Sequence, residues 1–144
     1  MCLIIKCRKI VGGLGFGQCL VTRQPINFLT MLDPETGIFH DLEHELHGRS
    51  LKSKVLVFPK AIGSSVGAYT LYSLKNKGLA PAAVICTGLI DIITASACAI
   101  SEIPAVDMKG QRFESKSMIR QGTQVLVDAD SCRIEIKKNI NLRV

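Results

Sequence analysis

Short apolar runs alternate with helical patterns in the middle of the chain, and this alternation most constrains the fold. "KVLVF" (54–58) has the length and the β-branched residues of a strand, and residues 66–78 place apolar side chains at helical spacing before a terminal glycine. "LAPAAVICTG" (79–88) then predicts a strand, 89–103 a helix and "PAVDM" (104–108) another strand. This β-α-β-α-β order predicts parallel strands with helical crossovers, and therefore an α/β fold.

The segments on either side of this central part predict further strands. Residues 6–22 indicate a strand, a glycine-rich turn at "GGLGFG" and a second strand, whereas 123–138 indicate two strands joined by "DADS". Between 27 and 54 we expect a loop-rich connection with a turn at "DPETG". The length of 144 residues is typical of one domain, so we predict a single domain over 1–144.

Charge and apolar patterning argue against nucleic-acid and membrane partners. The net charge is +6, but the basic residues are scattered and aromatic residues make up 5% of the chain, so stacking platforms for bases are not expected. The apolar stretch 80–100 carries Asp91 and turn residues, which favours a buried core over a membrane span. No signal-peptide pattern precedes it, and the six cysteines have no metal-ligand spacing, so we predict a cytoplasmic protein with reduced thiols.

Two polar or glycine-rich clusters resemble ligand sites but lack the required pattern. "GGLGFG" has neither the Lys-Ser/Thr of a phosphate loop nor a following helix, so we interpret it as a flexible turn or bulge. His40, His44 and His47 lie among Glu43 and Glu45, but their spacing is not HExxH. We therefore expect a polar connecting loop there and no metal site.

The segment "GSSVG" (63–67) is the strongest candidate for chemistry. Ser64 and Ser65 stand where the strand 54–58 gives way to a helix. A serine at that point can cap the helix, which stabilises it by about 1 kcal/mol. The same N–H groups can also stabilise an ionised oxygen, so a catalytic serine is the alternative. The spacing is not G-x-S-x-G, which disfavours a Ser-His-Asp hydrolase.

Five motifs, taken together and in order, point to a known family. They are "LDPETG" (32–37), "VLVFP" (55–59), "GSSVGAYTLYSL" (63–74), "GLAPAAVI" (78–85) and "IPAVD" (103–107). In this order and spacing the chain resembles the small-subunit, or swivel-domain, family of aconitase X, over about residues 12–127. The resemblance implies a swivelling β/β/α domain that docks on a separate large subunit and acts with it as a hydro-lyase on a small anionic substrate.

The resemblance also implies a division of labour at the active site. Ser64 would be the base that removes a proton, with Gly63 and Ser65 supplying N–H donors. A 4Fe-4S cluster would be held by the large subunit, and this chain would bind no cofactor or metal itself. Gly63, Ser65, Lys60 and Asp33 are weaker candidates for substrate binding. Asp91 is another candidate for the cleft, with a role at a turn or helix side as the alternative.

The substrate that the resemblance implies is (R)-5-phosphomevalonate, dehydrated to trans-anhydromevalonate 5-phosphate in the archaeal mevalonate pathway. Two departures from the family pattern bear on this. Ile62 stands where relatives usually carry a basic residue, and Leu29–Met31 replace a tryptophan and two glycines. A hydroxyproline dehydratase subunit and a non-catalytic partner domain of the same fold therefore remain the alternatives.

Overall fold

The computed structural model describes residues 2–137, which form eight strands and five short helices. The strands are β1 (Cys2–Lys6), β2 (Arg8–Val11), β3 (Leu14–Val21), β4 (Val55–Phe58), β5 (Ala83–Cys86), β6 (Ala105–Asp107), β7 (Gln124–Asp128) and β8 (Arg133–Lys137). The helices are α1 (Phe28–Met31), the 3-10 helix η1 (Ser65–Gly67), α2 (Ala68–Asn76), α3 (Ile92–Ser101) and α4 (Phe113–Ser117).

The strands lie in the order β1-β8-β7-β3-β4-β5-β6-β2. The four central strands, β3 to β6, are parallel, whereas β7, β8, β1 and β2 pair in antiparallel fashion. The outermost strands of this order, β1 and β2, are separated only by Cys7, whose N–H donates to the carbonyl of Cys132 at 3.0 Å. One continuous N-terminal segment therefore joins both edges of the sheet, and the sheet folds back on itself.

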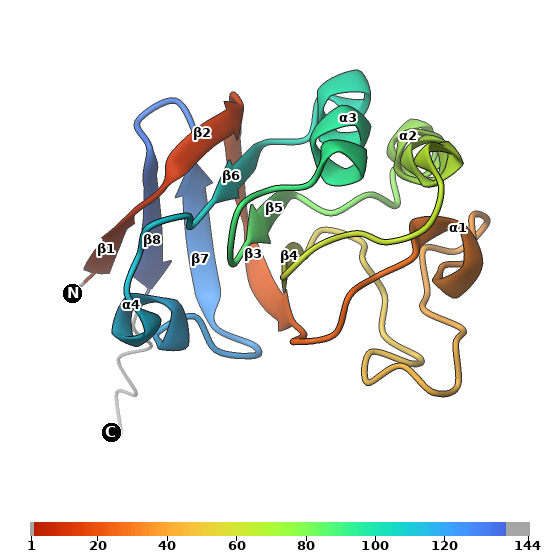
Figure 1. Cartoon of the computed structure of the whole chain (residues 1–144), viewed down its shortest axis with the longest axis horizontal. Helices are drawn as coiled ribbons and strands as arrows, with labels where there is room; N and C mark the ends of the chain where they lie inside the picture. The colour runs from red at the N-terminus through yellow and green to blue at the C-terminus, as the bar shows by residue number, and fades with distance from the viewer. Residues whose placement is uncertain (1, 138–144) are drawn as a thin grey trace, which may run out of the picture.

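This folding gives three layers, which follow one another from left to right in Figure 1: β1, β8 and β7, then β3 to β6, then the helices α1 to α3. The strand β4 shows why its sequence is apolar throughout. Leu56 and Phe58 pack in the core beneath the helices, whereas Val55 and Val57 pack in a second core between the two strand layers. A strand buried on both faces has no polar side. The expected β/β/α arrangement with central parallel strands is confirmed.

One local prediction was wrong, and two short helices were missed. The glycine-rich stretch is a turn only at Gly12 and Gly13, because Gly15 and Gly17 lie inside β3. A side chain at Gly15 would overlap the carbonyl of Ala82. The role of these glycines is therefore close packing of the backbone and not flexibility of a turn. The helices α1 and α4 were also not predicted, because four or five residues show no helical periodicity.

Candidate functional site

Ser64 lies in the connection between β4 and α2, where it caps η1. Its backbone is extended (φ −85°, ψ 158°), and its Oγ accepts a hydrogen bond from the N–H of Val66 at 3.1 Å. The side chain is exposed. The cap is therefore present, and the hydroxyl remains accessible to a ligand. The donor to this oxygen is the N–H of Val66, whereas the resemblance implied donors at Gly63 and Ser65.

Gly63 is required by the backbone and by its neighbour. Its φ is +93°, a region that residues with a side chain rarely adopt, and a Cβ there would overlap the amide group of Asn27. Asn27 in turn caps α1, because its Oδ1 accepts from the N–H groups of Leu29 and Thr30. Asn27 was missed at the sequence level. Its position directly before "FLTM" was the available signal for a helix cap.

Asp91 ties this loop to the start of α3. Its Oδ1 accepts from the N–H of Ala61 at 2.9 Å and from Thr94 Oγ1 at 2.8 Å, while Oδ2 accepts from the N–H of Thr94 at 2.9 Å. One carboxylate thus caps α3 and holds the backbone three residues before Ser64. These contacts give Asp91 the role at a helix end that the sequence left open as an alternative.

A second carboxylate, that of Asp107, holds the loop that carries Asp91. It is fully buried and accepts two hydrogen bonds from Arg8, at 2.7 and 2.6 Å, and one from the N–H of Ile90 at 3.0 Å. Burial alone would raise the pKa of Asp107, but the bonds from Arg8 and Ile90 outweigh it and lower the pKa below its usual value. Two linked carboxylates therefore position the Ser64 loop.

The other surroundings of the Ser64 loop include Lys60, Ile62 and Met31. Lys60 is exposed, and no ion pair to it exists among residues 2–137. Ile62 and Met31 line the same shallow pocket of about 260 Å³. One residue from each of the two departures from the family pattern therefore lines this pocket, and Ile62 is two residues before Ser64 in the chain. This pairing was not visible in the sequence.

Asp33 stabilises the turn that follows α1. Its carboxylate accepts from the N–H of Glu35 at 2.8 Å, and its carbonyl accepts from the N–H of Gly37 at 2.8 Å. The bond from Glu35 is the largest cause of the lowered pKa of Asp33. A substrate contact for Asp33 stays a prediction.

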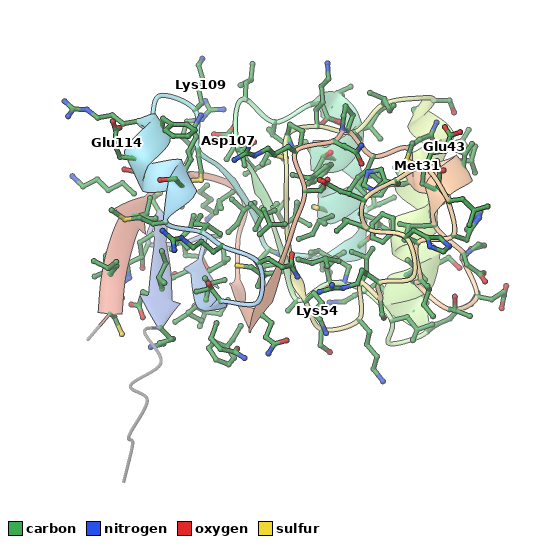
Figure 2. The ribbon with its side chains drawn as sticks, turned by 90° about the horizontal axis from the view of Figure 1, so that it is seen from below. Met31, Glu43, Lys54, Asp107, Lys109 and Glu114 are labelled. Atoms are coloured by element: carbon green, nitrogen blue, oxygen red, sulfur yellow. The ribbon has the colours of Figure 1, made fainter. Side chains whose placement is uncertain are left out.

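Figure 2 shows Met31 and Asp107 toward one edge of the molecule and Lys54, which precedes β4, toward the other. The carboxyl ends of the parallel strands lie at the first edge.

The histidine-rich segment is occupied by structural contacts. His44 is buried and stacks on Phe39 with 5.7 Å between ring centroids. Its Nδ1 accepts from the N–H of Leu46, so Nε2 carries the proton that is shared with the carbonyl of Pro25 at 3.2 Å. Within residues 2–137, no group of three or more His, Cys, Asp or Glu side chains could hold a metal ion.

The cysteines do not fit an iron–sulfur cluster. Four of the six are buried, namely Cys7, Cys19, Cys86 and Cys98. Burial raises the pKa of Cys7, Cys19 and Cys98 to about 12 and also raises the pKa of Cys86. Clusters are bound by several converging thiolates, and within residues 2–137 no group of three or more cysteine, histidine or carboxylate side chains could hold a metal ion. In the part of the chain that the structure describes, no helix has the length and apolar character needed to cross a membrane.

Known proteins similar to this chain share both sequence and fold with it. The family described as aconitase X swivel domain matches residues 4–136. The phosphomevalonate dehydratase small subunit of Thermococcus kodakarensis is 45% identical over 132 residues, which is 92% of this chain and 95% of that protein. The protein of the same name from Methanothrix thermoacetophila is 45% identical over 125 residues, covering 87% and 88%.

Two solved structures agree with these sequence matches. The crystal structure of Thermococcus kodakaraensis aconitase X in its holo form superposes with a TM-score of 0.86 at 43% identity, over 94% of this chain and 99% of that one. The solution NMR structure of a UPF0107 protein gives a TM-score of 0.84 at 35% identity, over 94% and 100%. The chain therefore belongs to the aconitase X swivel-domain family.

Proposed function

We propose that this chain is the small subunit of a phosphomevalonate dehydratase, with Ser64 as the base that removes the substrate proton. The relatives named above carry that activity in their names. The observation that carries the proposal for this chain is the exposed Ser64 Oγ, which accepts an N–H bond from Val66 while the loop behind it is fixed by Asp91.

The local geometry supports a proton transfer to Ser64. A serine oxygen can take a proton from carbon only as an alkoxide, and the Val66 N–H already points at the atom where that charge would form. The short η1 runs directly into α2, so the donor is held by a regular helix. Dehydration removes a proton from one carbon and a hydroxyl group from the next. In this proposal Ser64 removes the proton.

We assign removal of the hydroxyl group to the large subunit. The described residues, 2–137, do not fit a cluster, and a 4Fe-4S cluster held by the partner would supply a Lewis acid for the hydroxyl group. The named relatives are small subunits, which implies a large one. Exposed apolar side chains surround the Ser64 loop; we refer to them as the apolar rim, and they are Leu29, Ile62, Val66, Leu89 and Ile92. An apolar rim around a reactive group suits an interface that excludes water.

In this proposal, residues 1–144 form one swivel domain that works in the cytoplasm. The substrate is a small anion, with Lys60 and Ser65 as candidates for binding it and Gly63 allowing its close approach. The non-catalytic alternative is favoured by one observation, which is that Ile62 and Met31, one residue from each departure, line the same pocket. Direct measurement of turnover separates the two functions.

The experiment is anaerobic turnover of phosphomevalonate by the complex of this chain with its large subunit. We expect Ser64→Ala to lower kcat by about 10²- to 10⁴-fold, the usual contribution of a positioned base. Ser73→Ala, on α2 and away from the loop, is the matched control and should retain the wild-type kcat. Assembly of both variants with the large subunit is measured in parallel. An assembled Ser64→Ala complex with unchanged kcat would contradict the assignment.

A further inference from the structure

A cleft of about 520 Å³ opens at the carboxyl ends of three parallel strands, and Ser64 does not line it. Val21 is the last residue of β3, Pro59 directly follows β4 and Thr87 directly follows β5. Phe113, Lys116 and Ser117 of α4 close one side. In sheets with parallel strands, ligands bind in the crevice outside the carboxyl ends. The position of this cleft is therefore that of a ligand site.

The charged side chains that line the cleft are all basic. They are Arg23, Lys116 and Arg120, and none forms an ion pair with a carboxylate in residues 2–137. The carboxylate near the entrance, that of Glu45, accepts from the Thr22 hydroxyl and from the N–H of Arg23 at 2.9 Å, and it does not line the cleft. Three cations without a partner carboxylate, facing one concave space, produce a positive potential there.

The other lining groups fit an anion that carries an apolar part. Val57 and Ile119 are buried and form an apolar wall, and Phe113 is 74% exposed at the cleft. Gln121 uses its Oε1 to accept from the N–H of Val21 at 2.7 Å, so its amide NH₂ remains as a donor. Thr87 adds a hydroxyl group. The cleft thus combines donors and cations with an apolar surface.

We propose that this cleft binds the phosphate group of a small phosphate monoester, with Arg23, Lys116 and Arg120 as its ion-pair partners and the apolar wall against its carbon chain. Phosphate is favoured over carboxylate because its second negative charge and third oxygen match three cations, and because arginine binds phosphate oxygens in pairs. The proposal does not depend on Ser64. It goes beyond the proposed function by assigning a phosphate site to this chain.

Binding is tested on the full chain by NMR titration, since a 35% identical relative has been solved in solution. The probes are inorganic phosphate and propyl phosphate, with sodium chloride at equal ionic strength as the reference. We expect amide shifts at Thr87 and Gln121, with propyl phosphate binding more tightly than inorganic phosphate. Arg120→Gln should weaken binding about three- to tenfold, the effect of losing one partly screened charged bond.

The matched control is Arg49→Gln, because Arg49 is also exposed and lies outside the cleft. It should leave phosphate binding unchanged. Shifts that are the same with chloride, or that persist at wild-type affinity in Arg120→Gln, would overturn the proposal. So would an Arg120→Gln variant that weakens assembly with the large subunit while the wild-type chain shows no phosphate response, because the cleft would then be a docking surface.

Two sources of the phosphate group are separated in the complex with the large subunit. If the substrate supplies it, Arg120→Gln raises KM for phosphomevalonate about three- to tenfold at unchanged kcat, and propyl phosphate inhibits competitively. If another ligand supplies it, KM is unchanged and propyl phosphate binds with the substrate present. Both outcomes support a phosphate site. Ser64→Ala tests the proposed function separately, because it should lower kcat and leave phosphate binding intact.

Discussion

The two edges of the parallel sheet are built in different ways. At the amino edge, the main chain packs directly against the main chain: the N–H of Ala82 donates to the carbonyl of Lys54 at 2.8 Å, and Gly17 lies against the carbonyl of Ser53. At the carboxyl edge, two buried or half-buried carboxylates, Asp91 and Asp107, hold the loops from behind. Those loops carry Ser64 outward, together with Ile62 and Leu89 of the apolar rim.

The amino edge therefore contributes to stability, whereas the carboxyl edge exposes the reactive group. Backbone packed against backbone leaves no space for a ligand at these contacts, so we assign them to the stability of the fold. A loop held by a carboxylate is fixed at one point and exposed beyond it, which suits a group that must meet both a substrate and a partner chain. Substitutions at the two edges should therefore have different consequences.

The largest effect on folding is expected at the amino edge. Gly15→Ala forces a Cβ against the carbonyl of Ala82 and the side chain of Ala83, so the backbone must shift. We expect the free energy of unfolding to fall by about 3 kcal/mol. At the carboxyl edge, Gly88→Ala is the matched control, because a Cβ added there would have no other atom within 4 Å. Urea unfolding of both variants gives the comparison, and equal losses would contradict it.

The next effect is expected at Asp107. Asp107→Asn keeps the shape but removes the charge that Arg8 binds, and we expect a loss of about 2 kcal/mol at pH 7 because the site is buried. The folded pKa of Asp107 is lowered, so its stabilisation is present above the unfolded value of about 4. It is lost as the pH falls through the lower folded pKa. Urea unfolding across this range should show the variant and the wild type converging.

Asp130→Asn is the control for that prediction. Asp130 also has a lowered pKa, caused by its bonds with Lys9 and the N–H of Gly13, but its side chain is 58% exposed. Solvent screens an exposed pair, so this variant should change unfolding little. A loss as large as that of Asp107→Asn would show that burial is not what makes the Arg8 pair important.

A smaller effect on stability, but a clear one on turnover, is expected at Asp91. Asp91→Asn keeps one oxygen to cap α3 but replaces the other with a donor, so the bonds to Ala61 and Thr94 cannot all form. We expect a loss of about 1 kcal/mol in unfolding free energy. In the complex, kcat should fall about tenfold at nearly constant KM, because a displaced loop misplaces Ser64. An unchanged kcat would remove Asp91 from the positioning of Ser64.

The smallest effect is expected at Ile62, which is 40% exposed beside Ser64. Ile62→Lys places a cation where the family resemblance implies a basic residue, and we expect KM for the anionic substrate to fall about two- to fivefold with no change in folding. Leu42→Lys, at an 82% exposed position outside that pocket, is the control. Turnover that appears only with Ile62→Lys would instead favour the non-catalytic alternative for the wild-type chain.

The sequence predicted the centre of the fold well because that part depends on local patterns. The runs at β4 and β5 are apolar throughout because both faces are buried, and the helices between them follow ordinary spacing. Gly15 and Gly17 were misread because their role depends on Ala82 and Ser53, which follow far along the chain. No local pattern contains that information.

The sequence predicted Ser64 as the site but did not predict the residues that hold it in place. Its position between strand and helix is a local signal, and the family motifs around it are specific. The contacts that hold it are long-range: Arg8 and Asp107 are 99 residues apart, and Asp91 reaches back 30 residues to Ala61. The cleft with Arg23 and Arg120 likewise combines distant segments. Such pairs become visible only once the sheet has brought its strands together.

The central claim is that Ser64 reacts and does not merely cap a helix, and one pair of variants tests it directly. Asparagine caps helices as well as serine does but cannot form an alkoxide. In the complex with the large subunit, Ser64→Asn should restore the stability of about 1 kcal/mol that Ser64→Ala loses, while both variants keep kcat about 10²- to 10⁴-fold below wild type. A Ser64→Asn complex that turns over at the wild-type rate would contradict the claim.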